Sequence, residues 1–345
     1  MNNMKSPIVT VLMSVYNNEK TVSKTINSIL NQTFSDFEFL IINDASTDNT
    51  IDVVKSFSDS RIRIIDSSKN FGLTRSLNNG LGEAKGQFIA RIDADDISLP
   101  DRLKKQIDFL RKNPEFVLLG TSYNIINAYG DIIKKVIYNT SPEKLYYDLT
   151  FQNMFAHSSV MFKLEEVMGI GGYSESYRYA QDYDLWCKLV KKGRAWALPD
   201  VLTLWCSDPG NISSRRRQEQ NTASLNIFKN NLRKIGVSGN YLKNIDYLHN
   251  FYADDFIEIP SEIIHHAFDA MFFINNKLID NAPAFYSKSL LKDIAYSNIV
   301  DLLTRIYKNT GKKKEVLSFF TKNILNMRLV GKVLKKLFSF AKKAK

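Results

Sequence analysis

Apolar residues in the first 112 positions follow two alternating patterns. Short runs of apolar and β-branched residues predict buried strands at residues 8–15, 37–42, 61–65 and 88–92. Apolar residues spaced three or four positions apart predict helices at residues 19–30, 48–57, 73–84 and 100–112. This alternation predicts an α/β fold with a mostly parallel central sheet. Ligands of such sheets bind at the carboxyl ends of the strands.

The pattern changes along the rest of the chain. Residues 116–203 predict a mixture of strands and helices, and residues beyond 217 show helical periodicity to about residue 309. We therefore predict an α/β domain at 1–225, a helical region at 226–310 and a tail at 311–345. A chain of 345 residues with 44% hydrophobic content is sufficient for two domains with a sizeable core.

The net charge of +11 is concentrated at one end of the chain. Residues 311–345 carry eleven Lys or Arg side chains and one acid, so the other 310 residues are nearly neutral. A nucleic-acid-binding protein typically carries a basic stripe on a folded face, and we therefore expect no nucleic-acid partner. A terminal basic block instead indicates a tail with its own partner.

The tail also has an amphipathic pattern. On a helix, one apolar stripe is formed by Ile324, Met327, Val330, Leu334, Leu337, Phe338 and Ala341. Lysines fall largely on the opposite face or its borders, and no acid occurs after Glu315. This composition predicts a helix on an anionic membrane surface, with an ordinary helix packed on the domain as the alternative.

Cysteine usage and the N-terminal residues predict the compartment. Cys187 and Cys206 form no CxxC motif, which favours a reducing environment over a disulfide framework. The polar start lacks the apolar stretch of a signal peptide, and no run approaches the ~20 apolar residues of a membrane span. We expect a cytoplasmic protein, peripheral on the inner face of the plasma membrane.

A group of carboxylates directly follows the strand predicted at 88–92. Asp93 and Asp95, two positions apart at a turn, are suited to one divalent cation and its bound ligand. Mg²⁺ and Mn²⁺ prefer oxygen ligands and commonly share their shell with a substrate diphosphate. The alternative is an acidic turn in which Asp96 or Ser98 caps the helix beginning near Pro100.

Two further acidic segments allow a functional and a structural interpretation. Asp44 follows the second strand and is suited to accept a hydrogen bond from a base N–H, whereas Ser46 or Thr47 could cap the next helix with Asp48 in its first turn. Asp182 opens a predicted helix and is suited to act as a general base toward a hydroxyl group. Acids are also common in first helical turns for structural reasons alone.

Six segments, taken in order, resemble the family 2 glycosyltransferases, which have the GT-A nucleotide-binding fold. The resemblance covers about residues 7–205. The matching segments are residues 7–17 (PIVTVLMSVYN), 42–48 (INDASTD), 70–78 (NFGLTRSLN), 84–86 (AKG), 88–96 (FIARIDADD) and 181–186 (QDYDLW).

The resemblance implies roles for individual residues. The nucleotide would be bound by Val15, Tyr16, Asn17, Asp44 and Asp93, with Asp44 on the uracil edge and Asp93 on the ribose. Asp95 would bind Mn²⁺ or Mg²⁺, and Asp182 would be the catalytic base. Trp186 would shape the acceptor side as an aromatic platform. His157 would border the active site, although a lone His is often structural.

Two positions depart from the family pattern. Gln181 stands where members often have Glu, which removes a like charge beside Asp182. Cys206 and Asp208 occupy the positions of an Arg and a His in the closing loop. The following arginines, at 215–217, are candidates to supply the missing positive charge to the diphosphate.

The resemblance implies a metal-dependent inverting glycosyltransferase with a nucleotide-sugar donor, UDP being favoured. The acceptor would be a saccharide or a lipid-linked saccharide of bacterial surface polysaccharide. The alternative is a non-catalytic nucleotide-sugar or carbohydrate binding protein on the same fold, since fold alone does not imply activity.

Overall fold

The computed structural model describes residues 6–207, 216–242, 245–246, 248–249 and 261–310. The chain divides into two compact units, one formed by residues 1–149 and 153–224 and the other by residues 150–152 and 225–345. The predicted amphipathic tail lies outside the described residues and stays a prediction. Within the described residues, no helix combines the length and apolar character needed to cross a bilayer.

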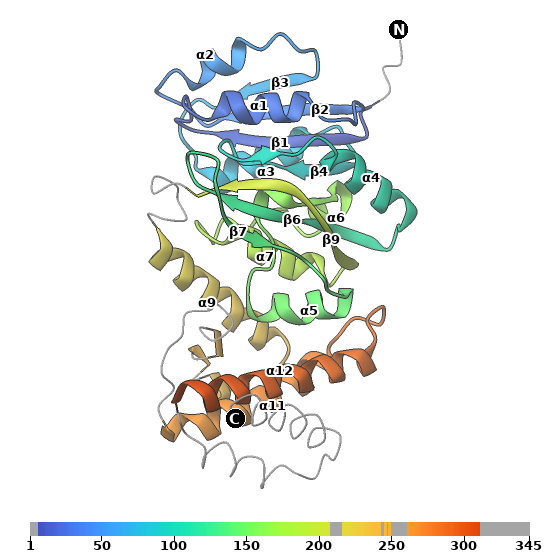
Figure 1. Ribbon diagram of the computed structural model, residues 1–345, viewed down its shortest axis with the longest axis vertical. Coiled ribbons are helices and arrows are strands. Elements are labelled where there is room, and N and C mark those ends of the chain that lie inside the picture. The colour runs from blue at the N-terminus through green and yellow to red at the C-terminus, as the bar shows by residue number, and fades with distance from the viewer. Residues whose placement is uncertain (1–5, 208–215, 243–244, 247, 250–260, 311–345) are drawn as a thin grey trace. The chain divides into compact units, whose positions relative to one another are not determined.

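A single sheet forms the centre of the first unit (Figure 1). In the described part of the chain its order is β3-β2-β1-β4-β8-β6-β9-β5, with β7 paired to β6. The strands are β1 (Val9–Val15), β2 (Phe37–Asn43), β3 (Ile62–Asp66), β4 (Phe88–Arg91), β5 (Ile97–Ser98), β6 (Phe116–Ile126), β7 (Ile132–Val136), β8 (Met161–Lys163) and β9 (Arg194–Cys206). β3, β2, β1 and β4 are parallel, whereas β8 is antiparallel to both β4 and β6. The predicted α/β fold is confirmed, and β6 and β9 form a further parallel pair besides the four parallel strands that precede residue 92.

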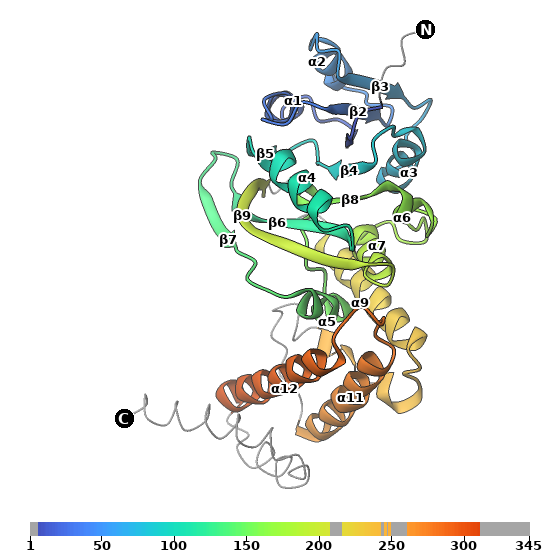
Figure 2. The ribbon, with the colours of Figure 1, turned by 90° about the vertical axis from the view of Figure 1, so that its right-hand side faces the viewer.

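Helices cover both faces of this sheet. In the first unit they are α1 (Val22–Leu30), α2 (Thr50–Lys55), α3 (Leu73–Glu83), α4 (Arg102–Lys112), α5 (Pro142–Phe151), η1 (His157–Ser159), α6 (Leu164–Met168) and α7 (Gln181–Leu189), and α9 (Arg217–Lys234) leads into the second unit. Figure 2 shows α1 and α4 on one side of the strands and α3 on the other. This two-sided cover explains why β1 and β2 are almost continuously apolar and buried.

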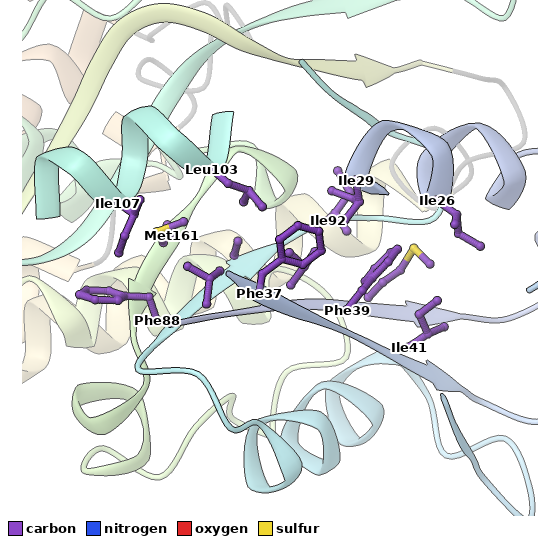
Figure 3. Close-up of a cluster of buried hydrophobic side chains, with 14 of the residues drawn as sticks. Ile26, Ile29, Phe37, Phe39, Ile41, Phe88, Ile92, Leu103, Ile107 and Met161 are labelled. Atoms are coloured by element: carbon purple, nitrogen blue, oxygen red, sulfur yellow. The ribbon is translucent and has the colours of Figure 1, made fainter. Parts of the chain in front are cut away.

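An apolar core lies between the sheet and helices α1 and α4 (Figure 3). Alternate residues of the parallel strands point to this face, among them Phe37, Phe39 and Ile41, and they pack with Ile26 of α1 and Ile107 of α4. These side chains are at most 4% exposed. The apolar side chains that recur with strand spacing and those that recur with helical spacing therefore pack together in one core.

Two glycines allow close approach of backbone to the sheet. A Cβ atom at Gly80 of α3 would lie 2.3 Å from Leu12 Cδ1, so α3 packs against β1 through this position. A Cβ atom at Gly86 would lie 2.3 Å from the backbone nitrogen of Thr10. The turn before β4 therefore requires glycine because the obstructing atoms are backbone.

Two helices begin later than the pattern predicts. α1 begins at Val22. Glu19, which the pattern placed inside this helix, instead lies in the preceding turn, where its side chain accepts hydrogen bonds from Asn49 at 3.1 Å. α2 begins at Thr50, whose N–H donates to Asp48 Oδ1 at 3.0 Å. The suggested cap at Ser46 or Thr47 is therefore wrong, because the Asp48 carboxylate accepts the N–H group of the first residue of this helix.

The second unit is helical in its described part. Besides the end of α9 it contains η2 (Gly239–Leu242), α11 (Ser261–Asp280) and α12 (Lys288–Thr310). Its core includes Phe228, Met271, Ile274 and Leu291, each fully buried.

Candidate active site

The predicted nucleotide-binding and metal-binding residues lie where parallel strands end. β1 ends at Val15, β2 ends at Asn43 before Asp44, and β4 ends at Arg91 before Asp93. Asn43 is the register partner of Val15, which places the ends of these two strands side by side. This is the edge at which α/β sheets bind ligands.

The loops after β1 and β2 are bound to each other. Asn17 has a left-handed backbone with φ of 55°, and its side chain accepts the Thr47 N–H at 2.8 Å. Its own N–H donates to Ser46 Oγ at 3.2 Å. Tyr16 beside it is 45% exposed and presents its ring at the surface. Val15 is buried, and its carbonyl oxygen accepts the Asp44 N–H at 2.9 Å.

Asp44 holds the loop that precedes α3. Its two carboxylate oxygens accept the backbone N–H groups of Phe71 and Gly72 at 2.9 and 2.8 Å. The side chain is 2% exposed. Asp44 therefore fixes the Asn-Phe-Gly segment of the motif at residues 70–78, in addition to the predicted contact with a base.

Asp93 is held by two residues that the sequence pattern did not single out. The fully buried Arg91 guanidinium pairs with Asp93 Oδ1, and Ser158 Oγ donates to Asp93 Oδ2 at 3.2 Å. Burial raises the pKa of Asp93, but the Arg91 charge and the Ser158 hydrogen bond outweigh it, so the pKa lies below its usual value. Asp93 is therefore ionised at neutral pH and fixed in one orientation.

Asp95 and Asp96 complete the acidic turn. Asp96 is fully buried, and its Oδ1 accepts the Cys206 N–H at 2.8 Å. Burial, together with the charges of Asp95 and Asp93, holds the pKa of Asp96 well above its usual value. Neither Asp96 nor Ser98 caps α4, because Ser98 Oγ accepts from the Arg102 guanidinium at 2.8 Å, so that alternative is wrong.

The same turn fits a divalent cation by its chemistry. Three carboxylates repel one another there, and Asp96 Oδ2 is buried without a hydrogen-bond partner among the described residues. Asp95 is partly exposed and is therefore accessible to solvent and ligand. The described residues contain no cluster of three or more His, Cys, Asp or Glu suited to a metal. Diphosphate and water would complete the shell around Asp95.

Asp182 lies in the first turn of α7, after Ala180 with its left-handed φ of 57°. Asn153 Nδ2 donates to Asp182 Oδ2 at 2.8 Å. Burial raises the pKa of Asp182, and the Asp93 charge adds to this rise against the lowering effect of Asn153. The Asp93 charge therefore acts on Asp182, although the two carboxylates come from different elements.

His157 interacts with Asp93, and Trp186 packs against His157. His157 Nε2 shares a hydrogen bond of 2.8 Å with the Tyr173 hydroxyl, and burial, with a contribution from Arg91, lowers the pKa of His157 to about 3. The imidazole is therefore neutral at neutral pH. Trp186 is fully buried, with its ring 6.0 Å from that of His157. The structure thus offers no exposed Trp186 face to a sugar and places this residue as support for His157.

Three residues of the site were missed by sequence reasoning: Arg91, Ser158 and Asn153. Arg91 is a charged residue inside an otherwise apolar strand, and this was the one available signal, because a buried charge requires a partner. Ser158 and Asn153 reach their carboxylates across 65 and 29 positions and have no local signature.

Part of the predicted closing loop is described. Cys206 lies at the end of β9, and Asp208 and Arg215 lie outside the described residues. Arg216 is exposed and pairs with Glu219 at 3.0 Å. A role for these arginines toward a diphosphate stays a prediction.

Comparisons with known proteins show which family the chain is similar to. Residues 10–164 match the family model described as glycosyl transferase family 2. The UDP-Glc:alpha-D-GlcNAc-diphosphoundecaprenol beta-1,3-glucosyltransferase of Escherichia coli is 32% identical over 270 residues, which cover 77% of this chain and 98% of that protein. The chain belongs to glycosyltransferase family 2.

Solved structures show the fold of this glycosyltransferase. TarS residues 1–349 of S. aureus, in complex with UDP-GlcNAc, matches with a TM-score of 0.58 at 17% identity, covering 78% of this chain and 81% of that one. The mannosyltransferase PcManGT of Pyrobaculum calidifontis, in complex with GDP-Man and Mn²⁺, matches with a TM-score of 0.52 at 17% identity, covering 94% and 88%. The expected GT-A fold is confirmed.

Proposed function

We propose that this glycosyltransferase inverts the anomeric centre of a UDP-sugar while transferring the sugar to a lipid-linked saccharide of surface polysaccharide. The observation that supports the proposal is that Asp182, in the first turn of α7, is influenced by the charge of Asp93, which directly follows β4. An inverting displacement requires a base on the acceptor side of the anomeric carbon and a bound diphosphate leaving group on the opposite side. Asp182 and the Asp93–Asp96 turn supply these two parts.

Asp182 acts as the base in this proposal. It takes the proton from the acceptor hydroxyl as that oxygen attacks the anomeric carbon. Its burial raises its pKa and so makes the carboxylate a stronger proton acceptor. Asn153 holds one carboxylate oxygen, which orients the other toward the acceptor. A single displacement converts an α-linked donor into a β-linked product.

The donor is held by residues at the ends of β1, β2 and β4. Asp44 reads the uracil edge, Tyr16 and Asn17 line the nucleoside pocket, and Asp93 binds the ribose. A Mn²⁺ or Mg²⁺ ion on Asp95, when bound, supplies Lewis-acid stabilisation of the departing diphosphate. Fixed Asp93 and Asp44 position the donor before reaction, which lowers the entropic part of the barrier.

The relatives support the choice of donor and acceptor class. The Escherichia coli relative is named for UDP-Glc and for an acceptor on diphosphoundecaprenol. The TarS structure contains UDP-GlcNAc, which is also a UDP-sugar. An acceptor with a polyprenyl anchor requires the enzyme to work at a bilayer surface. We therefore retain the proposed peripheral membrane location and the membrane-binding tail at 311–345.

A transfer assay tests this function. The full chain is incubated with Mn²⁺, single UDP-sugars and a synthetic saccharide diphosphopolyprenol, and the linkage is assigned by NMR. We expect a β-linked product from one α-linked donor. An α-linked product would refute inversion. Tight UDP-sugar binding without turnover of any donor would instead support the alternative of a non-catalytic binding protein.

Truncation after Asn309 tests the tail. We expect the truncated chain to sediment less with vesicles containing anionic lipid than the full chain does, because eleven cationic side chains are removed. Equal sedimentation of both chains would show that the tail does not contribute.

A further inference from the structure

In the hairpin of β6 and β7, β7 is an outer strand that pairs with β6 off the main strand order. We call residues 123–137 the β6–β7 arm. Figure 2 shows β7 outside β6, away from α6 and α7. Four large apolar side chains of the arm are exposed: Tyr129 (93%), Ile133 (60%), Ile137 (54%) and Ile132 (50%). A strand that packs on a core buries one face, whereas both faces of β7 are exposed.

Two lysines interrupt this apolar surface. Lys134 and Lys135 are exposed, and their cross-strand partners are Ile125 and Asn124. Among the described residues neither lysine forms an ion pair. Asp131 is the one acid of the arm, so the arm keeps a net charge of +1. It therefore combines isoleucines, a tyrosine and net positive charge, a composition that favours an anionic membrane interface.

The arm starts at the edge of the sheet that carries the donor carboxylates. Ile126, the last residue of β6, is the register partner of Cys206. The Cys206 N–H donates to Asp96 Oδ1 at 2.8 Å. The turn with Tyr129 begins one residue after Ile126, so a surface bound by this turn lies at the active-site edge.

Hydrogen bonds fix the arm at its tip and at its base. At the tip, Asn127 Oδ1 accepts the N–H groups of Tyr129 and Asp131, each at 2.9 Å. At the base, the buried Tyr138 donates its hydroxyl to the Met154 carbonyl, next to Asn153 of the site. The arm is therefore held in position rather than extending as a free loop.

We propose that the β6–β7 arm docks the enzyme on a bilayer containing anionic phospholipid, with Tyr129, Ile132 and Ile133 at the interface. A second copy paired along β7 is the other candidate partner. Lysines in the middle of an edge strand oppose such pairing, because they bring like charges together across the two strands. Phospholipid headgroups instead neutralise Lys134 and Lys135. This inference goes beyond the proposed function, since vesicle binding is measured without turnover.

Vesicle sedimentation tests the charged part of the arm. The full chain is mixed with vesicles of phosphatidylglycerol and phosphatidylcholine, or of phosphatidylcholine alone. Each lysine near an anionic surface contributes about fivefold, so Lys134→Gln with Lys135→Gln should lower the partition coefficient about 25-fold. The matched control is Lys112→Gln with Lys192→Gln, two exposed lysines outside the arm. Equal partitioning of the two double variants would overturn the proposal.

A fluorescent label separates the arm from any binding by the tail. An NBD dye is attached to Tyr129→Cys and, as the control, to Met168→Cys, which is also an exposed apolar position. The parent chain is labelled in parallel, so that the signal of dye attached to Cys206 can be measured and subtracted. We expect a blue shift with anionic vesicles at position 129 and none at 168.

Two outcomes would contradict docking by the arm. The first is an unchanged spectrum at position 129 while the protein sediments with vesicles. The second is a dimer in solution that Tyr129→Ser with Ile133→Ser dissociates, without any vesicle binding; this outcome would assign the arm to a second copy.

Discussion

Asn153 offers a direct test of how the proposed base is controlled. Its Nδ2 donates to Asp182 Oδ2 at 2.8 Å, and its Oδ1 accepts the Phe155 N–H at 3.2 Å, which fixes the amide orientation. In Asn153→Ala the carboxylate loses a donor that stabilises its charged form. The pKa of Asp182 should therefore rise further above its usual value.

The magnitude follows from the hydrogen bond that is lost. A hydrogen bond to a charged group contributes about 1.5–3 kcal/mol, and the lower end applies because Asn153 is exposed. About 1.5 kcal/mol corresponds to about tenfold in the proton equilibrium. On the acid limb of kcat/KM, where the ionised base is limiting, we expect activity to fall about tenfold. At high pH, where Asp182 is ionised in both proteins, the loss should be much smaller.

The assay is the pH profile of kcat/KM for transfer to a fixed acceptor. Asn139→Ala is the matched control, because Asn139 is also an exposed Asn of this unit, whereas the side-chain donor to Asp182 is Asn153. We expect the acid limb to move to higher pH in Asn153→Ala alone. A uniform loss at every pH, with an unmoved acid limb, would refute the idea that Asn153 sets the protonation of the base.

Further predictions concern the carboxylates and one glycine. Asp182→Asn should lower turnover at least ~10²-fold with donor binding nearly unchanged; normal turnover, measured under saturating donor, would exclude Asp182 as the base. Asp95→Ala, or EDTA, should abolish transfer while circular dichroism shows a folded protein, and full activity in metal-free buffer would contradict the metal site. Gly86→Ala should lower the free energy of unfolding by about 1–3 kcal/mol, because its Cβ would lie 2.3 Å from Thr10 N. Gly82→Ala, with no atom within 4 Å, is its control in thermal denaturation.

The sequence by itself determined the first four strands, the helices between them and the position of the acidic turn. Local patterns are sufficient there because continuous apolar runs require burial on both faces of a strand. Helices α3 and α4 repeat their apolar residues with helical spacing, and the structure ends both within a residue of the predicted end. The carboxyl end of β4 then places Asp93 and Asp95 at the ligand-binding edge.

Only the tertiary structure decided which groups surround those carboxylates. Ser158 and Asn153 become partners of Asp93 and Asp182 through the path of the chain, and no local pattern encodes contacts across 65 and 29 positions. The surroundings of Trp186 could not be predicted from local sequence patterns either. Most positions of α7 are buried, so its periodicity does not distinguish an indole in the core from one at the surface. Burial against His157 and Phe162, both distant in sequence, fixed its place.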